Sequence, residues 1–397
     1  MKVLIIHNHY QQTGGENIAV NAQIELLNQH GHSLSFYIQD NHEIDTYSPL
    51  QKLAIGPRAI YSLRAYQDIR KLIAEIRPDV AHIHNVFPLI SPAVYRTLSK
   101  LGIPIVQTLH NFRFLCPNGL FFTQGKICER CKKGNTLHAV AYKCYRDSYL
   151  LSALYALSIG LHRRMGTFHL INRFIALTGF TAGKMIESGL ATEDKLSILG
   201  NFLPDTSHKG GSIQPGRPYI LFIGRLSLEK GVMTLLQAMN GIRELDLKIA
   251  GDGPQMKELQ LATHNLDLSN VVFLGRITGS PKWELLQNAT AVVVPSLLYE
   301  NFPLSILESM SVGTLVVTSD IGSIPYIISD GQTGLLFRPG NADDLREKIN
   351  WLTAHPNDVS RLAQNGKNNF TTNYSAEAHY NSLINIYKET IEGNMLH

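Results

Sequence analysis

Two glutamates eight residues apart, Glu300 and Glu308, follow the apolar run Ala291 to Val294. The run is typical of a buried parallel strand, and Pro303 suits the first position of a helix. Such a helix directs its unpaired N–H groups and the positive end of its dipole beyond the strand ends. Glu300 would lie in the loop at that opening, and Glu308 roughly 7.5 Å further along the helix. One acid could then reach a sugar on one side of a diphosphate and the other a ribose on the opposite side. The segment therefore predicts a nucleotide-sugar site.

A second loop carries two cations that could bind a diphosphate. Its sequence, Gly-Arg-Leu-Ser-Leu-Glu-Lys-Gly at 224–231, follows the strand-like run 219–223 and precedes a helical run. Arg225 could fork onto two phosphate oxygens, and Lys230 could act as a point charge that helps to neutralise a leaving diphosphate. A solvated loop with an unrelated Arg and Lys is the alternative, because short Gly/Lys patterns match by chance.

Two turn sequences close the next strand-like runs. Gly251-Asp-Gly-Pro254 follows one run and Gly275-Arg276-Ile277 follows another. Both are ordinary turn chemistry when taken alone. Beside the Arg/Lys loop, at the carboxyl ends of strands, their backbone amides could face a base and a ribose.

Candidate residues in the first half of the chain follow strand-like runs as well. Residues 13–16, Thr-Gly-Gly-Glu, come after the first run and open a helix, so the amides of Gly14 and Gly15 could face the donor phosphate or the acceptor. Glu16 is an acceptor-side candidate in the same segment. A lone Gly-Gly turn is weak evidence, and its position after the first strand is what supports the prediction.

Three further candidates end two neighbouring strands. His110 ends the predicted strand 103–109, where it would face the site or be a hydrogen-bonded strand-end residue. His84 and Asn85 end the predicted strand 80–84 and are acceptor-side candidates.

All four cysteines lie in one segment, the predicted insertion 112–145. Cys128-x2-Cys131 is half of a structural zinc site, and Cys116 and Cys144 could supply the other two ligands. A reducing cytosol disfavours disulfides, which favours zinc. The alternative is that these residues are small buried hydrophobes.

Composition limits the class of protein. The chain has 397 residues, enough for two domains, with 44% hydrophobic and 17% charged residues and a mean hydropathy of -0.04. The formal charge of +4 and the pI of about 8.7 are mildly basic, which suits anionic lipid or phosphorylated ligands and is too weak to predict nucleic-acid binding.

The first apolar stretch is too short for a signal peptide, so we expect a cytoplasmic protein. Segment 147–169 is either an ordinary buried helix or a peripheral contact with the inner face of the membrane.

Strand-like and helical runs alternate along the whole chain, which predicts parallel sheets in an α/β fold. Predicted strands are 3–6, 34–38, 80–84, 103–109 and 174–177, then 219–223, 247–250, 271–274, 291–294, 315–318 and 334–337. Two successive series indicate two doubly wound domains, 1–200 and 201–375, joined by the Gly/Pro/Ser-rich stretch 200–216. A final helix of about 376–391, within a carboxyl-terminal segment 376–397, is expected to pack back on the first domain.

Taken in order, these motifs resemble the retaining glycosyltransferases of family four, which have the GT-B fold of two Rossmann-like domains facing a central cleft. The resemblance covers essentially the whole chain. It implies that Arg225 and Lys230 hold the donor diphosphate, that Glu300 contacts sugar hydroxyls and Glu308 the ribose, and that His110 lies near the donor sugar. The donor-side set that it implies is Gly14, Gly15, Arg225, Lys230, Gly251, Arg276, Ile277, Glu300, Asn301, Phe302, Pro303, Leu304 and Glu308, of which Arg225, Lys230 and Glu300 act with His110 in catalysis.

The resemblance also implies an activity. We expect transfer of a hexosyl unit with retention from a UDP- or GDP-linked donor to a carbohydrate or lipid-linked acceptor, in cell-surface polysaccharide or glycolipid synthesis. The chain has no Asp-x-Asp triplet, so Arg225, Lys230 and a helix amino terminus would replace a catalytic metal. A non-hydrolysing sugar-nucleotide epimerase and an inactive, membrane-associated binding protein are the alternatives.

Overall fold

The computed structural model describes residues 1–10, 14–204 and 216–395, without the side chains of 49–54. The chain divides into two compact units: unit 1 contains Met1–Thr123, Cys128–Asn201 and His379–His397, and unit 2 contains Gln124–Ile127 and Phe202–Ala378. The predicted boundary at 200/201 is one residue from this division. Most of the predicted linker, and Thr13 of the first glycine turn, lie outside the described residues.

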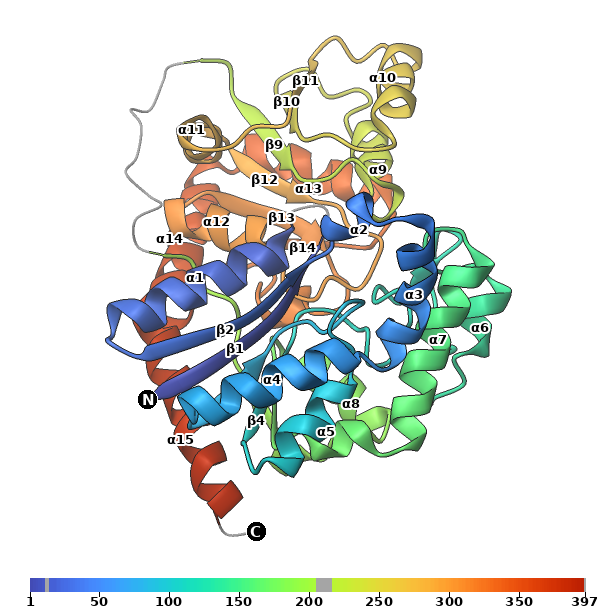
Figure 1. Cartoon of the computed structure of the whole chain (residues 1–397). Helices are drawn as coiled ribbons and strands as arrows, with labels where there is room; N and C mark the ends of the chain where they lie inside the picture. Colours follow the sequence, from blue (N-terminus) through green and yellow to red (C-terminus); the bar gives the residue numbers. More distant parts are fainter. Residues whose placement is uncertain (11–13, 205–215, 396–397) are drawn as a thin grey trace. The chain divides into compact units, whose positions relative to one another are not determined.

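Unit 1 is built on a six-stranded parallel sheet with the order β2-β1-β3-β4-β7-β8 (Figure 1). The strands are β1 (Lys2–His9), β2 (Ser33–Asp40), β3 (Val80–Ile83), β4 (Ile105–Leu109), β7 (Arg173–Ala176) and β8 (Leu196–Ile198). Its helices are α1 (Gly15–Gln29), α2 (Glu43–Thr46), α3 (Pro49–Ile60), α4 (Leu63–Ile76), α5 (Ala93–Lys100), α6 (Leu137–Ala141), α7 (Tyr149–Arg164) and α8 (Gly179–Glu187). The order reverses direction between β1 and β3.

Unit 2 contains a second six-stranded parallel sheet, with the order β11-β10-β9-β12-β13-β14. The strands are β9 (Tyr219–Ile223), β10 (Asp246–Ala250), β11 (Val271–Gly275), β12 (Ala291–Val294), β13 (Leu315–Ser319) and β14 (Leu335–Phe337). The helices are α9 (Val232–Ala238), α10 (Met256–Asn265), α11 (Ser280–Asn288), α12 (Leu304–Val312), α13 (Ala342–Ala354) and α14 (Pro356–Asn373). This is the Rossmann strand order, and its switch point lies between β9 and β12.

Helix α15 (Ala376–Met395) returns the end of the chain to unit 1, where it runs beside β1 (red in Figure 1). Leu383, Ile386 and Tyr387 are buried in one cluster with Val3 and Ile5 of β1. Burial of each such side chain stabilises the unit by roughly 1.5–3 kcal/mol, so the helix is part of the unit 1 core.

Two predicted boundaries differ from the structure. We expected Pro303 to be the first helical residue, but its backbone is extended (ψ 116°) and α12 begins at Leu304. The helical pattern is clear only over residues 23–30, but α1 begins at Gly15, within the segment 13–16 that we expected to open a helix, and its buried face includes Ala19 and Val20.

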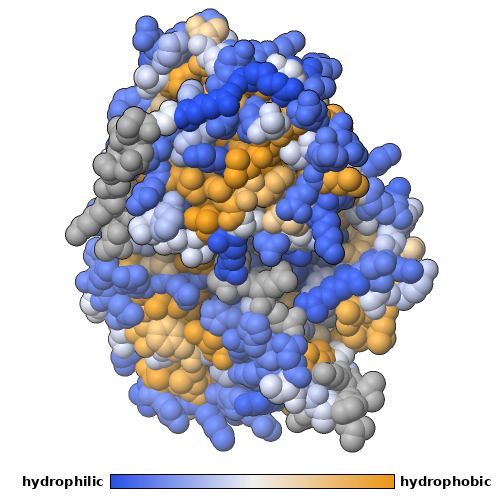
Figure 2. Space-filling view, turned by 90° about the horizontal axis from the view of Figure 1, so that it is seen from above, coloured by the Kyte–Doolittle hydropathy of each residue, from blue (hydrophilic) through white to orange (hydrophobic). Residues whose placement is uncertain are grey.

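The described residues contain no helix that is both long and apolar enough to cross a membrane. The face shown in Figure 2 is mostly hydrophilic, with smaller hydrophobic areas between the polar residues. Most of this face is therefore suited to contact with water.

Candidate functional site

The loops that leave β9 and β12, at the switch point of unit 2, meet in a polar cluster. Lys230 Nζ lies 2.6 Å from Glu300 Oε1, and the hydroxyl of Ser296 donates to the same oxygen at 2.5 Å. Glu300 is buried and Lys230 is half-buried. No partner of Glu300 Oε2 is present among the described residues, so one carboxylate oxygen is held while the other is left for a ligand.

A glycine fixes the close approach of these two loops. Gly231 has a left-handed backbone (φ +67°), and a Cβ added there would lie 1.9 Å from the carbonyl oxygen of Pro295. The N–H of Leu297 donates to the carbonyl of Glu229 at 2.8 Å, which joins the loops a second time. Any larger residue at 231 would separate them, and with them Lys230 from Glu300.

The second glutamate has its own cation. Glu308, in the middle of α12, is 7% exposed, and its Oε1 lies 2.5 Å from Lys282 Nζ of α11. Burial raises the pKa of Glu308, and Lys282 opposes that effect. The ion pair with Lys282 therefore holds the Glu308 carboxylate in place on α12.

The other donor-side candidates of unit 2 differ in their exposure and in their contacts. Arg225 and Arg276 are exposed, and the Arg225 guanidinium makes no hydrogen bond or ion pair within the described part of the chain. Ile277 and Asn301 are half-buried, and Leu304 gives α12 its first N–H. Phe302 is buried with its ring against that of Tyr374 (centroids 5.7 Å apart).

The backbone N–H of Gly251 is used in a hydrogen bond within the protein. Its N–H donates to the carbonyl of Gly275 at 2.7 Å, and a Cβ there would lie 1.8 Å from the carbonyl oxygen of Gly224. The turn therefore brings three strand ends together, and its amide is not free to face a ligand in this structure.

In unit 1, His84 and His110 meet at the ends of β3 and β4. His84 Nδ1 lies 2.9 Å from His110 Nε2, and His84 Nε2 is buried with no hydrogen-bond partner among the described residues. Burial, with His7 and His379 nearby, lowers the pKa of His110 to about 3, so both rings are neutral near pH 7. An unpaired buried N–H costs more than an unpaired lone pair, which favours donation from His84 to His110. His110 would then carry its proton on Nδ1.

The remaining unit 1 candidates differ in what they leave for a ligand. Gly14 precedes α1 and Gly15 begins it, both exposed. Glu16 accepts from Asn111 at 3.0 Å through Oε2, and its buried Oε1 has no partner among the residues that the structure describes. Burial raises the pKa of this carboxyl to about 7. Asn85 is occupied by backbone groups, donating to the carbonyl of Asn8 at 2.8 Å and accepting from the N–H of Phe87.

Comparison with known proteins identifies the family. Residues 205–369 match "Glycosyl transferases group 1", and residues 13–205 match "Glycosyltransferase Family 4". An uncharacterised glycosyltransferase of Methanocaldococcus jannaschii, MJ1178, is 30% identical over 98% of both chains. The chain belongs to glycosyltransferase family 4.

Other relatives of this glycosyltransferase match in part. The D-rhamnosyltransferase WbpZ of Pseudomonas aeruginosa is 35% identical over 43% of this chain and 42% of its own. Several curated relatives are matched over only about half of their length. The crystal structure of Anabaena HepE in complex with UDP has a TM-score of 0.70 at 16% identity and covers 98% of this chain, which supports the GT-B fold of two Rossmann-like domains.

Some residues of the candidate site could not be found from sequence. Lys282 and Ser296 carry no motif of their own; Ser296 lies four residues before Glu300, but Lys282 is 26 residues from Glu308. Asn111 and its contact with Glu16 join positions 95 residues apart. Ser296 and Asn111 follow the ends of β12 and β4, a position that could have indicated them, whereas Lys282 lies within α11 and has no such signal.

Proposed function

We propose that this glycosyltransferase moves a hexosyl unit from a nucleotide-diphosphate sugar to an acceptor hydroxyl, with retention, in cell-surface polysaccharide or glycolipid synthesis. The observation that carries the proposal is the Lys230–Glu300–Ser296 cluster at the switch point of unit 2. Ligands of doubly wound folds bind there, beyond the carboxyl ends of the strands. The exposed Arg225 belongs to the same loop as Lys230, so two cations are available to one diphosphate.

In the proposed reaction, the bond between the sugar C1 and the diphosphate oxygen breaks. The acceptor oxygen bonds to C1 on the face that the diphosphate leaves, and its proton passes to a departing phosphate oxygen. Arg225 and Lys230 stabilise the growing negative charge, a kind of contact worth several kcal/mol in a dry site. Glu300 orients sugar hydroxyls, Glu308 binds the ribose, and His110 donates from Nδ1 near the sugar.

This mechanism needs no catalytic metal, because fixed cations and the N–H groups at the start of α12 provide the positive charge. A direct check is transfer in the presence of excess EDTA. Turnover within twofold of the untreated enzyme is expected, and complete loss that Mg²⁺ or Mn²⁺ restores would contradict this part of the proposal.

The donor site is tested by thermal shift with UDP, GDP, their sugar conjugates and the matching nucleosides. Ligands that bind the native state raise the melting temperature by mass action. One nucleoside diphosphate should raise it and the nucleoside should not. Lys230→Met should abolish the shift, whereas Lys257→Met, which removes an exposed lysine of α10, should not. Equal shifts in the two variants would place the ligand elsewhere.

A lipid-linked acceptor would bring the enzyme to a membrane, and we propose that α7 contacts anionic lipid. Leu150, Leu157 and Leu161 are 67%, 56% and 39% exposed, at spacings that place them on one helix face. Arg146 and Arg164 are exposed at either end of this face. Anionic liposomes should sediment the wild type and the control Leu261→Ser at low salt, but not Leu150→Ser/Leu157→Ser. No sedimentation of wild type would refute the contact.

A further inference from the structure

A small cavity in unit 1 gathers all four cysteines of the chain. Cys116, Cys128, Cys131 and Cys144 line a space of about 10 Å³ together with His138, and all four are free thiols. A space of this size holds roughly one water molecule. It is therefore suited to a single ion and too small for an organic ligand.

The backbone, not the side chains, brings the four thiols to this cavity. The N–H of Cys128 donates to the carbonyl of Phe121 at 2.7 Å, and the N–H of Cys144 donates to the carbonyl of Ala139 at 2.9 Å. Burial raises the pKa of the Cys116 and Cys131 thiols, and backbone N–H groups of residues 118, 119 and 121 at Cys116 and of Ala139 at Cys131 oppose that effect. N–H groups directed at sulfur stabilise thiolates, and a second shell of this kind accompanies most metal sites.

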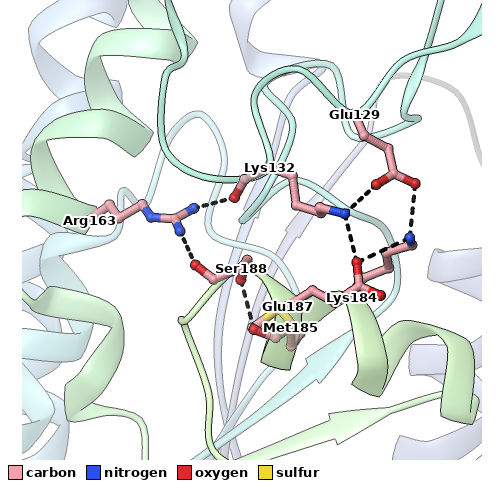
Figure 3. A network of polar contacts seen from close by, with 7 residues as sticks. All are labelled: Glu129, Lys132, Arg163, Lys184, Met185, Glu187 and Ser188. Atoms are coloured by element: carbon pink, nitrogen blue, oxygen red, sulfur yellow. Dashed lines mark hydrogen bonds and ion pairs between the residues drawn. The ribbon is translucent and has the colours of Figure 1, made fainter.

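Polar contacts hold the loop that carries Cys128 and Cys131 against α7 and α8 (Figure 3). Lys132 and Lys184 each pair with Glu129 and with Glu187, at N–O distances between 2.5 and 3.3 Å. Arg163 of α7 donates to the carbonyl of Lys132 at 2.8 Å and also to that of Ser188. The loop is thus fixed on both sides of Cys131, which preorganises the Cys-x2-Cys pair.

Two of the thiols now have neutral partners. Cys116 Sγ donates to Asn118 Oδ1 at 2.9 Å, and Cys144 Sγ donates to Thr123 Oγ1 at 3.6 Å. Within the described residues, no three His, Cys, Asp or Glu side chains are arranged to hold a metal as they stand. Binding therefore requires these thiols to leave their partners, lose their protons and turn into the cavity, a change in side-chain torsion that leaves the backbone hydrogen bonds in place.

We propose that Cys116, Cys128, Cys131 and Cys144 bind one Zn²⁺ as four thiolates. Four protein ligands leave no open coordination position, so the ion would be structural. It would join three chain segments, at 116, 128–131 and 144, of which the polar contacts of Figure 3 fix only the second. This role is separate from sugar transfer, which the proposed function assigns to other residues.

Metal content of the purified full chain is the first measurement. We expect about one zinc per chain, and a value below about a tenth after growth with added zinc would overturn the proposal. Co²⁺ exchanged into the protein should give the visible bands of a tetrahedral thiolate site. Two disulfides in the native mass spectrum, or the absorption of an iron–sulfur cluster, would also overturn it.

Variants locate the metal. Cys131→Ser and Cys144→Ser should each lose most of the zinc, while His138→Gln, in the same cavity wall, should keep about one per chain. Loss in His138→Gln would overturn the four-thiolate assignment. If the cysteine variants fail to fold, the zinc is removed from the wild type with a chelator, and hydrogen exchange is compared before and after removal. Protection should fall in 116–144 and stay unchanged in unit 2, and unchanged protection throughout would refute a structural zinc.

Discussion

At the scale of single residues, the two glutamates of the unit 2 candidate site each form an ion pair with a lysine. Glu300 is bound to Lys230 and Glu308 to Lys282. A buried carboxylate without a partner would cost several kcal/mol, so each lysine stabilises a charge that the site needs. Lys230 differs from Lys282 because the proposed function gives it a second anion, the donor diphosphate.

This double role predicts opposite effects of two substitutions. Glu300→Gln releases Lys230 and removes the acid that orients the sugar. Affinity for the nucleoside diphosphate should therefore stay equal or rise, while turnover falls at least about tenfold. Lys230→Met should weaken both. Calorimetric titration with the diphosphate and initial rates separate the two outcomes, and a parallel loss of affinity in Glu300→Gln would contradict this assignment.

At the scale of elements, the unit 2 site depends on how closely two loops approach. Gly231→Ala would place a methyl group on the carbonyl of Pro295 in a left-handed conformation, so we expect a loss of more than about 2 kcal/mol in the free energy of unfolding. Gly241→Ala is the matched control, with φ +88° but no atom within 4 Å of the added Cβ, and should cost only about 1–2 kcal/mol. Urea unfolding compares them, and equal losses would show that strain alone, not the contact with Pro295, sets the effect.

Helix α15 makes a polar contact inside the unit 1 core as well as apolar ones. The hydroxyl of Tyr387, fully buried, lies 2.6 Å from His82 Nδ1. Tyr387→Phe should lower the free energy of unfolding by about 1–3 kcal/mol, because buried polar partners are left with fewer hydrogen bonds. Tyr380→Phe removes a half-buried hydroxyl bonded to His32 and should cost less than about 1 kcal/mol. The reverse ranking in urea unfolding would refute this view of α15.

At the scale of the whole molecule, the buried histidines make the stability of unit 1 depend on pH. Burial lowers the pKa of His7 and His379 to about 4 and of His110 to about 3, and that of His82 and His84 well below the usual value. Between about pH 6.5 and 4 the unfolded chain binds these protons and the native unit does not, so stability falls as the pH falls. Glu16, whose pKa is raised to about 7, acts in the opposite direction but is a single group.

The two tryptophans, Trp283 and Trp351, both belong to unit 2 and allow the units to be followed separately. Each histidine should remove about 2 kcal/mol of unit 1 stability at pH 5 relative to pH 7. In urea at pH 5, circular dichroism should therefore report a transition at lower denaturant than tryptophan fluorescence does. Coincident transitions whose midpoints do not change between the two pH values would contradict the prediction.

Much of this architecture could be predicted from sequence, since β9 and β12 end at the predicted residues and the glycine loops follow directly. Strand β8 was missed because its three residues, Leu-Ser-Ile, form no apolar run; the first two are half-buried and Ile198 is exposed. The Lys230–Glu300 and Glu16–Asn111 contacts join residues far apart in the chain, so no local pattern could show them. The periodicity of a sequence predicts its helices and strands, but which side chains from different elements come into contact depends on the strand order.

The discontinuous path of unit 1 bears on how the protein is made. A ribosome synthesises nearly all of unit 2 before α15, whose side chains complete the core against β1. Domains usually fold as they emerge, from the amino terminus onward. Unit 1, which is synthesised first, would therefore complete its folding last. The apolar side chains of β1, which begins at Lys2, become covered only after α15, which begins at Ala376, has been synthesised.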